Sequence, residues 1–355
     1  MGRHVLVPVL VVAFLSILAI PAGAVTPAGP RLAISVFTNA PGEEDGGSEV
    51  MTTGPSGEDP RRLLGGPGAS IGDSLAWSGD GNSLAFGVSG VESTASGRFG
   101  TGWQVVAVAQ LDSGTTRAFP RAFLNAGEPV LAADGGSVAF QRVKLVKILP
   151  GRESYLFKSA IWTLDVGDGS VRRLTPWRLA AFLEPISYSP DGSAIVAEYF
   201  DYRRDPRVVA VDLRGRRTRR LALLGRNASE PTYSPDGTKL AFVRLKRAQT
   251  MLPEPERPVS ELVVASANGT GTERVVRRRG YMSFPSWDPS GSRLAFTLDP
   301  PAEATGSLER EPGNEVMAVN ADGTCLTRVF TDPEVTVYGS AWQPGPGREA
   351  GRIEC

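Results

Sequence analysis

The sequence predicts an all-β fold: a six-bladed β-propeller closed by strands from both ends of the chain and preceded by a signal peptide. Three observations predict it: a repeated motif, a regular spacing between its copies, and incomplete repeats at the two ends that complement each other. The composition agrees, because 41 Gly and 28 Pro in 355 residues suit short strands joined by tight turns.

The repeated motif joins an aromatic residue to a Gly-containing turn and then to an apolar strand. Clear copies occupy 76–86, 187–197, 232–242 and 286–296, a weaker copy occupies 130–140, and a sixth begins at 341 and stops. In the fullest copy Pro235 presets φ at the second turn position, and Gly237 takes the left-handed fourth position. The anchors at 77, 131, 188, 233, 287 and 342 are 54, 57, 45, 54 and 55 residues apart, which fits one four-stranded blade and a loop per repeat.

The two ends of the chain together make one blade. Residues 32–37, 49–53 and 61–64 read as second, third and fourth strands, and 339–343 supplies the missing first strand. Closure of this kind leaves no broad open sheet edge. The predicted domains are a signal peptide at 1–24, a linker at 25–30, the propeller at 31–343 and a C-terminal tail at 344–355.

The first residues have the pattern of a secretory signal. Arg3 and His4 are followed by an apolar run at 5–20 and by a small-residue cleavage site, Ala22-Gly23-Ala24. We expect a secreted or extracytoplasmic protein, in the periplasm or cell envelope, with no membrane span after signal cleavage. An uncleaved membrane anchor is the alternative.

The scarcity of histidine narrows the possible chemistry. His4 is the only histidine, so the mature chain can have no Ser-His-Asp triad, no Cys-His pair and no His-ligated metal. We assign no catalytic residue, and an enzyme would have to use carboxylates, Lys or Tyr. The 38 basic and 38 acidic residues balance, so a nucleic-acid partner is not expected.

Two cysteines, Cys325 and Cys355, are present. In an oxidising compartment an isolated pair favours a disulfide, which in this chain would tie the tail to the last repeat. Two free thiols are the alternative.

Glu-Pro precedes the first strand in three consecutive repeats, at Glu128, Glu184 and Glu230. First strands line the channel of a propeller, so three carboxylates are expected at one channel mouth. Such a cluster could hold a cation such as Ca²⁺ or receive a basic peptide end. The alternative is that each Glu forms only local hydrogen bonds where the chain turns inward. No other cofactor is expected.

Connections on the same face as this mouth are long in the sequence. They are expected as loops at 38–48, 89–102, 143–155, 200–207, 245–260 and 299–314. Loops on a rigid scaffold favour binding, and solvated insertions are the alternative. The Arg-rich fourth strands, for example 171–174 and 218–221, indicate protected blade edges, with a basic rim for anions as the alternative.

The Tyr-Ser-Pro-Asp-Gly-x-x-Leu-Ala-Phe pattern, with its Asn-Ala-Asp-Gly-Thr partner at 320–324, resembles the repeats of TolB-like propellers, also called WD40-like or PD40 repeats. The resemblance covers residues 31–343. TolB itself carries a small α/β domain before its propeller, and prolyl oligopeptidases carry a triad-bearing hydrolase domain beside theirs. We expect neither domain in this chain.

The resemblance implies a fold more than a function. The leading hypothesis is an extracytoplasmic module that binds a protein or peptide at the cell envelope, as a monomer. The alternative is a carboxylate- or metal-dependent enzyme acting on a polysaccharide or small metabolite in the channel. A structural envelope protein without a defined ligand is the third hypothesis.

Overall fold

A computed structural model describes residues 29–355 apart from 39–46, 67–68, 91–102, 125–128, 150–153, 180, 202–203, 215–216, 222–223, 226, 246–258 and 300–313. The predicted signal peptide therefore lies outside the described residues. Within the described part of the chain, no helix is long and apolar enough to cross a membrane.

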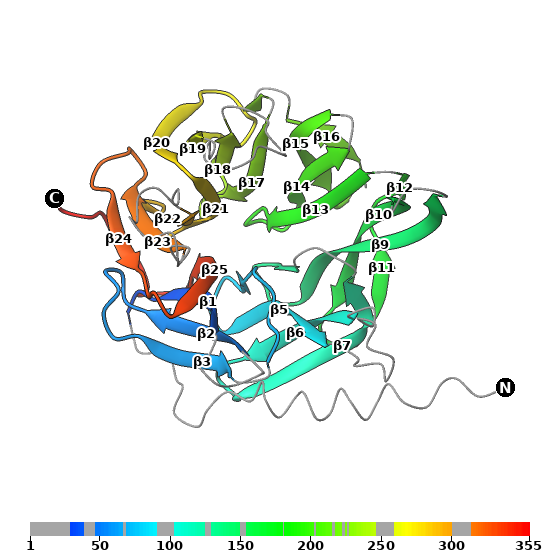
Figure 1. Cartoon of the computed structure of the whole chain (residues 1–355), viewed down its shortest axis with the longest axis horizontal. Helices are drawn as coiled ribbons and strands as arrows, with labels where there is room; N and C mark the ends of the chain where they lie inside the picture. The colour runs from blue at the N-terminus through cyan, green and yellow to red at the C-terminus, as the bar shows by residue number, and fades with distance from the viewer. Residues whose placement is uncertain are drawn as a thin grey trace.

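The strands form six antiparallel sheets arranged as blades around a central axis (Figure 1). Within each blade the strands run from the innermost to the outermost in the order named. Blade 1 contains β25 (Val335–Trp342), β1 (Leu32–Thr38), β2 (Gly47–Thr53) and β3 (Arg61–Gly65). Blade 2 contains β4 (Ala76–Trp77), β5 (Ser83–Gly90), β6 (Trp103–Gln110) and β7 (Thr115–Leu124). Blade 3 contains β8 (Val130–Leu131), β9 (Ser137–Leu149), β10 (Ser154–Asp165) and β11 (Val171–Arg173), with β12 (Arg178–Leu179) also paired to β10.

The other three blades follow in the same order. Blade 4 contains β13 (Ala181–Tyr188), β14 (Ala194–Asp201), β15 (Arg204–Asp212) and β16 (Thr218–Arg220). Blade 5 contains β17 (Ala228–Tyr233), β18 (Lys239–Leu245), β19 (Val259–Ser266) and β20 (Glu273–Arg279). Blade 6 contains β21 (Tyr281–Trp287), β22 (Arg293–Asp299), β23 (Glu315–Asn320) and β24 (Thr327–Phe330).

Strands from the two ends of the chain close the ring, as the sequence predicts. β25, near the C-terminus, pairs with β1, and Leu32 lies opposite Trp342 in the register. Figure 1 shows the two strands, red and blue, side by side in one blade. The prediction of a six-bladed all-β propeller is confirmed.

The core consists of six apolar clusters, and each lies between two neighbouring blades. The repeated second strands supply their centres, where Phe86, Phe140, Phe242 and Phe296 are fully buried. Blade 1 joins the ring through the same kind of packing, because its Leu32 and Ile34 share a cluster with Ala295 and Val316 of blade 6. Every blade therefore depends on both neighbours to bury its two faces.

The Asp residues of the repeated turns have a structural role. In blade 5 the Ser234 hydroxyl donates to Asp236 Oδ1 at 2.6 Å, and the same oxygen accepts the Thr238 N–H at 3.0 Å. Gly237 completes the turn with a φ of 72°, a conformation that glycine adopts without strain. The repeated Asp therefore closes a turn and is satisfied there.

Two of the expected loops are strands, which corrects the sequence prediction. β9 and β10 together cover most of 143–155, and β14 and β15 cover most of 200–207. In β9, polar and apolar residues alternate from Arg142 to Leu145, and a polar residue, Lys147, returns only two positions later. The interruption is Val146, which lies at a register shift and is 48 % exposed. A β-bulge of one residue hides the alternation that would predict a strand. The other four expected loops lie mostly outside the described residues.

Candidate functional site

The propeller has a central channel formed by two adjoining cavities of about 690 Å³ and about 340 Å³. Both cavities touch the same ring of seven residues, which come from all six blades: Ser74, Leu75, Val130, Ile186, Thr232, Ser286 and Ala341. Four of these side chains are apolar. The channel therefore has a largely apolar waist between two mouths of different character.

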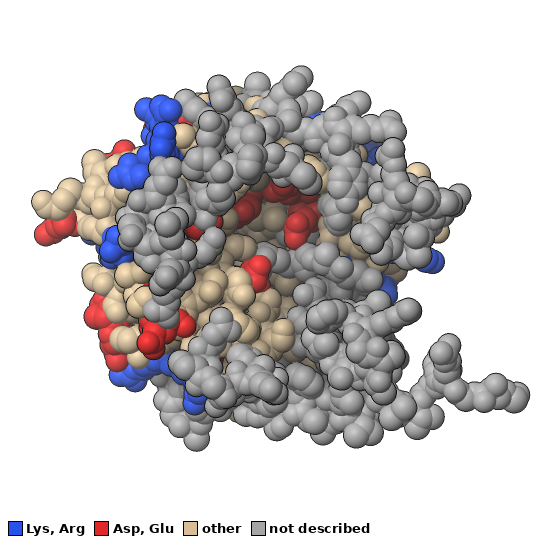
Figure 2. Space-filling model, viewed as in Figure 1, with Lys and Arg blue, Asp and Glu red and all other residues tan. Residues whose placement is uncertain are grey.

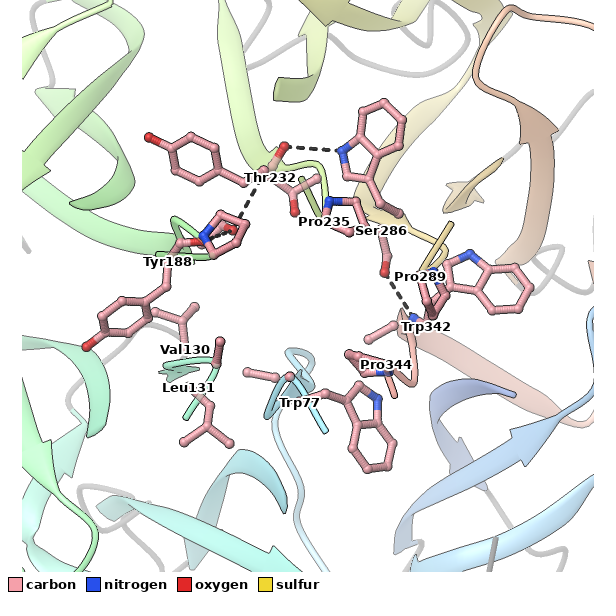
Figure 3. Close-up of a pocket in the computed structure, with 18 of the residues that line it drawn as sticks. Trp77, Val130, Leu131, Tyr188, Thr232, Pro235, Ser286, Pro289, Trp342 and Pro344 are labelled. Atoms are coloured by element: carbon pink, nitrogen blue, oxygen red, sulfur yellow. Dashed lines mark hydrogen bonds between the residues drawn. The ribbon is translucent and has the colours of Figure 1, made fainter. Parts of the chain in front are cut away.

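The larger cavity opens where the repeated turns lie. Proline residues of four turns surround it: Pro190, Pro235, Pro289 and Pro344. The aromatic residues at the motif anchors also contact this cavity, but in Figure 3 the rings of Trp77, Tyr188 and Trp342 point away from its centre. These rings belong to the clusters between blades, and all three residues are buried. The rings of the anchor residues therefore pack between neighbouring blades. Backbone atoms and proline rings supply much of the surface of this mouth.

Hydrogen bonds between neighbouring innermost strands make the channel wall rigid (Figure 3). The Trp287 indole N–H donates to the Thr232 carbonyl at 3.3 Å. The Trp342 backbone N–H donates to the Ser286 hydroxyl at 3.0 Å, and the Tyr233 backbone N–H donates to that of Ser187 at 3.3 Å. These hydrogen bonds join the innermost strands of neighbouring blades along the channel wall.

The smaller cavity is acidic. It is lined by four carboxylates, Asp73, Glu184, Glu198 and Glu230. Figure 2 shows acidic side chains gathered in the central hollow of the ring. The structure therefore brings together two of the three predicted glutamates, Glu184 and Glu230. The third, Glu128, lies outside the described residues.

Glu198, on the second strand of blade 4, also lines this cavity and was not predicted from the sequence. Glu184 of β13 lies directly opposite Glu198 of β14 in the register. Like charges at directly opposed positions destabilise an antiparallel pair. The placement of Glu184 opposite Glu198 therefore lowers the stability of this strand pair, and packing of the strands does not require two acids there.

Glu230 enters the cavity at a register shift in β17, between Ser229 and Thr232. Its φ of 49° lies in the left-handed region, which costs free energy for a residue other than glycine. Its backbone N–H donates to Glu198 Oε2 at 3.3 Å, and its own Oε2 accepts the backbone N–H of Phe284 in blade 6. A bulge of this kind re-aims a side chain, and at this position it links the carboxylates of blades 4 and 5 to the backbone of blade 6.

Two of these carboxyl groups are adjusted to titrate near neutral pH. Loss of solvent on burial raises the pKa of Glu230 to about 8, and the charges of Glu198 and Glu184 add to the rise. Burial also raises the pKa of Glu198 to about 7, with a contribution from Glu184. In both cases a backbone hydrogen bond acts in the opposite direction and does not offset the effect. The site can therefore hold or release protons in the neutral range.

The described residues give no support for a bound metal. Among them, no group of three or more His, Cys, Asp or Glu side chains is arranged to hold an ion. Glu184, Glu198 and Glu230 share a cavity without converging on one point. The predicted calcium site includes Glu128, which lies outside the described residues, so that site stays a prediction.

The predicted disulfide is present between Cys325 and Cys355, with the Cα atoms 5.5 Å apart. It holds the tail along the turn side of the ring, where Gly345, Pro346 and Glu349 contribute to the wall of the larger cavity. The C-terminal tail therefore forms part of one channel mouth.

Comparison with solved structures identifies the fold. TolB from Acinetobacter baumannii superposes with a TM-score of 0.62 and 20 % sequence identity over 89 % of this chain and 67 % of that one. A putative TolB from Agrobacterium tumefaciens gives 0.53 and 17 % over 89 % of this chain and 99 % of that one. This chain has the fold of a TolB-like propeller.

The TolB-like propeller fold extends to other proteins at similar identity. A puromycin-hydrolyzing peptidase from Mycobacterium tuberculosis matches with a TM-score of 0.50 and 13 % identity, over 84 % of this chain and 45 % of that one. No family model and no curated protein matches the sequence. At these identities the likeness concerns the TolB-like fold, and the function has to be argued from the channel.

Proposed function

We propose that this TolB-like propeller is an extracytoplasmic module that binds a protein or peptide segment in its central channel. The observation that carries the proposal is the channel itself: two adjoining cavities with a shared ring of seven lining residues on a rigid wall. Ligand sites in proteins are concave, largely apolar, and carry a few placed polar groups. The apolar waist and the acidic mouth have this composition.

The preformed wall favours recognition of a flexible chain. The inter-blade hydrogen bonds of Trp287 and Trp342 hold the innermost strands in place before any ligand arrives. A rigid site lowers the entropic cost that binding has to overcome. The loss of conformational entropy on binding is then mainly that of the ligand. A peptide segment can offset this loss with favourable contacts along the channel.

The proposed location is the periplasm or cell envelope. The Cys325–Cys355 disulfide is the state expected in an oxidising compartment. The apolar run at 5–20 with its small-residue cleavage site supplies a route there. A ring closed by strands from both ends of the chain also suits a protein that acts as a monomer.

A plugged channel tests the proposal. Thr232 lies in the waist and contacts both cavities, so Thr232→Trp should fill the waist while the backbone carbonyl still accepts the Trp287 indole. Thr218→Trp, on the exposed outer strand of blade 4, is the matched control. The immobilised proteins are presented with a random peptide library. We expect wild type and Thr218→Trp to enrich the same peptides, and Thr232→Trp to bind them at least tenfold more weakly. Equal retention by a folded Thr232→Trp protein would contradict the proposal.

The raised pKa values of Glu198 and Glu230 favour a second candidate, an enzyme that uses carboxylates. Acids that titrate near neutral pH are suited to general acid–base catalysis. A panel of chromogenic oligosaccharides and polysaccharides tests it, because glycoside hydrolysis uses paired carboxylates. This candidate requires turnover with a bell-shaped pH profile that Glu198→Gln and Glu230→Gln each lower at least a hundredfold. Absence of turnover across the panel would leave the binding function as the better account.

A further inference from the structure

We infer that the acidic mouth of the channel binds a primary ammonium group, either the amino terminus of a peptide or a lysine side chain. The inference rests on the proposed function, because it assigns a ligand chemistry to the same channel. Four features of the smaller cavity carry it: the sign of its charge, an unpartnered buried hydroxyl, the lack of convergence needed for a metal, and the adjoining apolar waist.

The charge of the cavity lining has one sign. The described residues that line the cavity include Asp73, Glu184, Glu198 and Glu230 and no Lys or Arg. They come from three different blades, and loss of solvent also raises the pKa of Asp73. Carboxylates that lose solvent without a compensating cation are destabilising. The described lining residues offer Glu198 and Glu230 no positive charge, and a cationic ligand would supply one.

A buried serine hydroxyl at the same cavity also indicates a ligand, independently of the acids. Ser340 of β25 also lines this cavity, and it is 5 % exposed. Its hydroxyl oxygen has no hydrogen-bond partner among the described residues. Ser340 precedes Trp342 by two positions, as Leu75 precedes Trp77 and Ile186 precedes Tyr188, and these equivalents line the cavity too. A buried hydroxyl without a partner carries a free-energy cost, which a ligand donor at this wall would remove.

The same wall selects an organic cation over a metal ion. Calcium requires six to eight converging oxygen ligands, and the described carboxylates do not form such a group. An ammonium group has three donors, which can reach separate acceptors on different blades. The carboxylates of Glu198 and Glu230 and the Ser340 hydroxyl provide acceptors on blades 4, 5 and 1. The waist beyond them, with Leu75, Val130 and Ile186, can accommodate the apolar part of the ligand.

Binding of an ammonium group should be coupled to proton release. Burial raises the pKa of both Glu198 and Glu230 into the neutral range, so at pH 6 these groups are largely protonated. Only the ionised form attracts a cation. Among the described residues, the other titratable groups at this mouth are Asp73 and Glu184, with Tyr338 near Asp73. Affinity should therefore rise between about pH 6 and pH 9, as long as the ligand amine stays protonated.

Three short peptides separate the two sources of the ammonium group. The probes are tetra-alanine amide with a free amino terminus, the same peptide acetylated, and an acetylated peptide that carries one lysine. Binding to the full chain is measured by calorimetry at pH 6, 7 and 8 in buffers of different ionisation enthalpy. We expect one or both amine-bearing peptides to bind at least tenfold more tightly than the acetylated tetra-alanine, with protons released at pH 7.

Substitutions then locate the site. Glu198→Gln with Glu230→Gln should reduce the preference for the amine to less than threefold, whereas Glu273→Gln on the exposed outer strand of blade 5 should leave it unchanged. Equal binding of capped and amine-bearing peptides would overturn the inference. So would micromolar calcium binding that the double variant loses, because a metal would then be the ligand. Peptides retained in the channel without an amine preference would leave the proposed function standing.

Discussion

The backbone N–H of Glu230 donates to the Glu198 carboxylate at 3.3 Å, across the boundary between blades 5 and 4. A carboxylate of one blade thus anchors the bulge that carries the carboxylate of the next. This relationship explains how two acids can be held together in a region poor in solvent. It also makes the stability of the ring sensitive to their protonation.

We expect the free energy of unfolding to fall as the pH rises from about 4.5 to about 8. The pKa of Glu230 is about 8 in the folded chain, against an ordinary value of 4.5. Between these values the unfolded chain releases this proton and the folded chain retains it, so rising pH favours unfolding. Glu230→Gln removes the ionisation and keeps an oxygen that can accept the Phe284 N–H. It should raise the unfolding free energy at pH 9 by more than about 1 kcal/mol, and much less at pH 5.

Urea unfolding at pH 5, 7 and 9 measures this effect. Glu273→Gln, on the exposed edge of blade 5, is the control and should leave the pH dependence of wild type unchanged. A Glu230→Gln protein that retains the full wild-type slope between pH 5 and pH 9 would refute the assignment of the slope to this carboxyl group.

The fold could be predicted from the sequence because its signals are local and repeated. Pro235 and Gly237 mark one turn of a motif that recurs at every blade, and Leu32 and Trp342 fall at the ends of complementary half-blades. The extension of β9 could not be predicted in the same way. Val146 shifts the alternation by one residue, and only the pairing with β10 shows that the strand continues.

The candidate site was only partly predictable. Glu184 and Glu230 share a Glu-Pro signal that places them at the start of first strands. Glu198 has no such signal, because it lies inside the second strand of its blade as an ordinary strand residue. The equivalent positions in the other five blades are occupied by Ser35, Gly87, Gln141, Val243 and Thr297. Glu198 is therefore the one acidic residue at this position of the repeat. The raised pKa values depend on burial and on distances between blades, which no single repeat encodes.

Loss of the disulfide should lower stability without opening the ring. The bond spans 30 residues, and closure of a loop of this size restricts the unfolded chain by roughly 3 to 4 kcal/mol. The tail also has noncovalent anchors, since the Asn320 side chain accepts the Ile353 N–H at 2.7 Å and donates to the Ile353 carbonyl at 3.0 Å. Cys355→Ser should therefore lower the unfolding free energy by about 2 to 4 kcal/mol and keep the circular dichroism spectrum of wild type. Dithiothreitol should destabilise wild type and have no effect on the variant. A variant as stable as oxidised wild type would show that the bond contributes nothing to folding.

Outside the apolar clusters, Gln343 is the residue at the ring closure whose substitution we expect to lower the unfolding free energy most. It is fully buried just beyond β25, where its backbone N–H donates to the Arg31 carbonyl at 2.9 Å. Its side-chain amide donates to the Gly81 carbonyl of blade 2 at 2.7 Å and accepts from Arg348 of the tail at 3.0 Å. Gln343→Ala would leave the buried Gly81 carbonyl without this donor and would remove one acceptor of Arg348, so we expect a loss of about 1 to 3 kcal/mol in the unfolding free energy. Gln110→Ala, on the third strand of blade 2, is the matched control, because the Gln110 side chain is half-buried and its Oε1 accepts the Ser83 hydroxyl at 3.0 Å within the same blade. Chemical denaturation of both variants measures the difference, and equal losses would mean that Gln343 has no special part in joining the last strand to the first two blades.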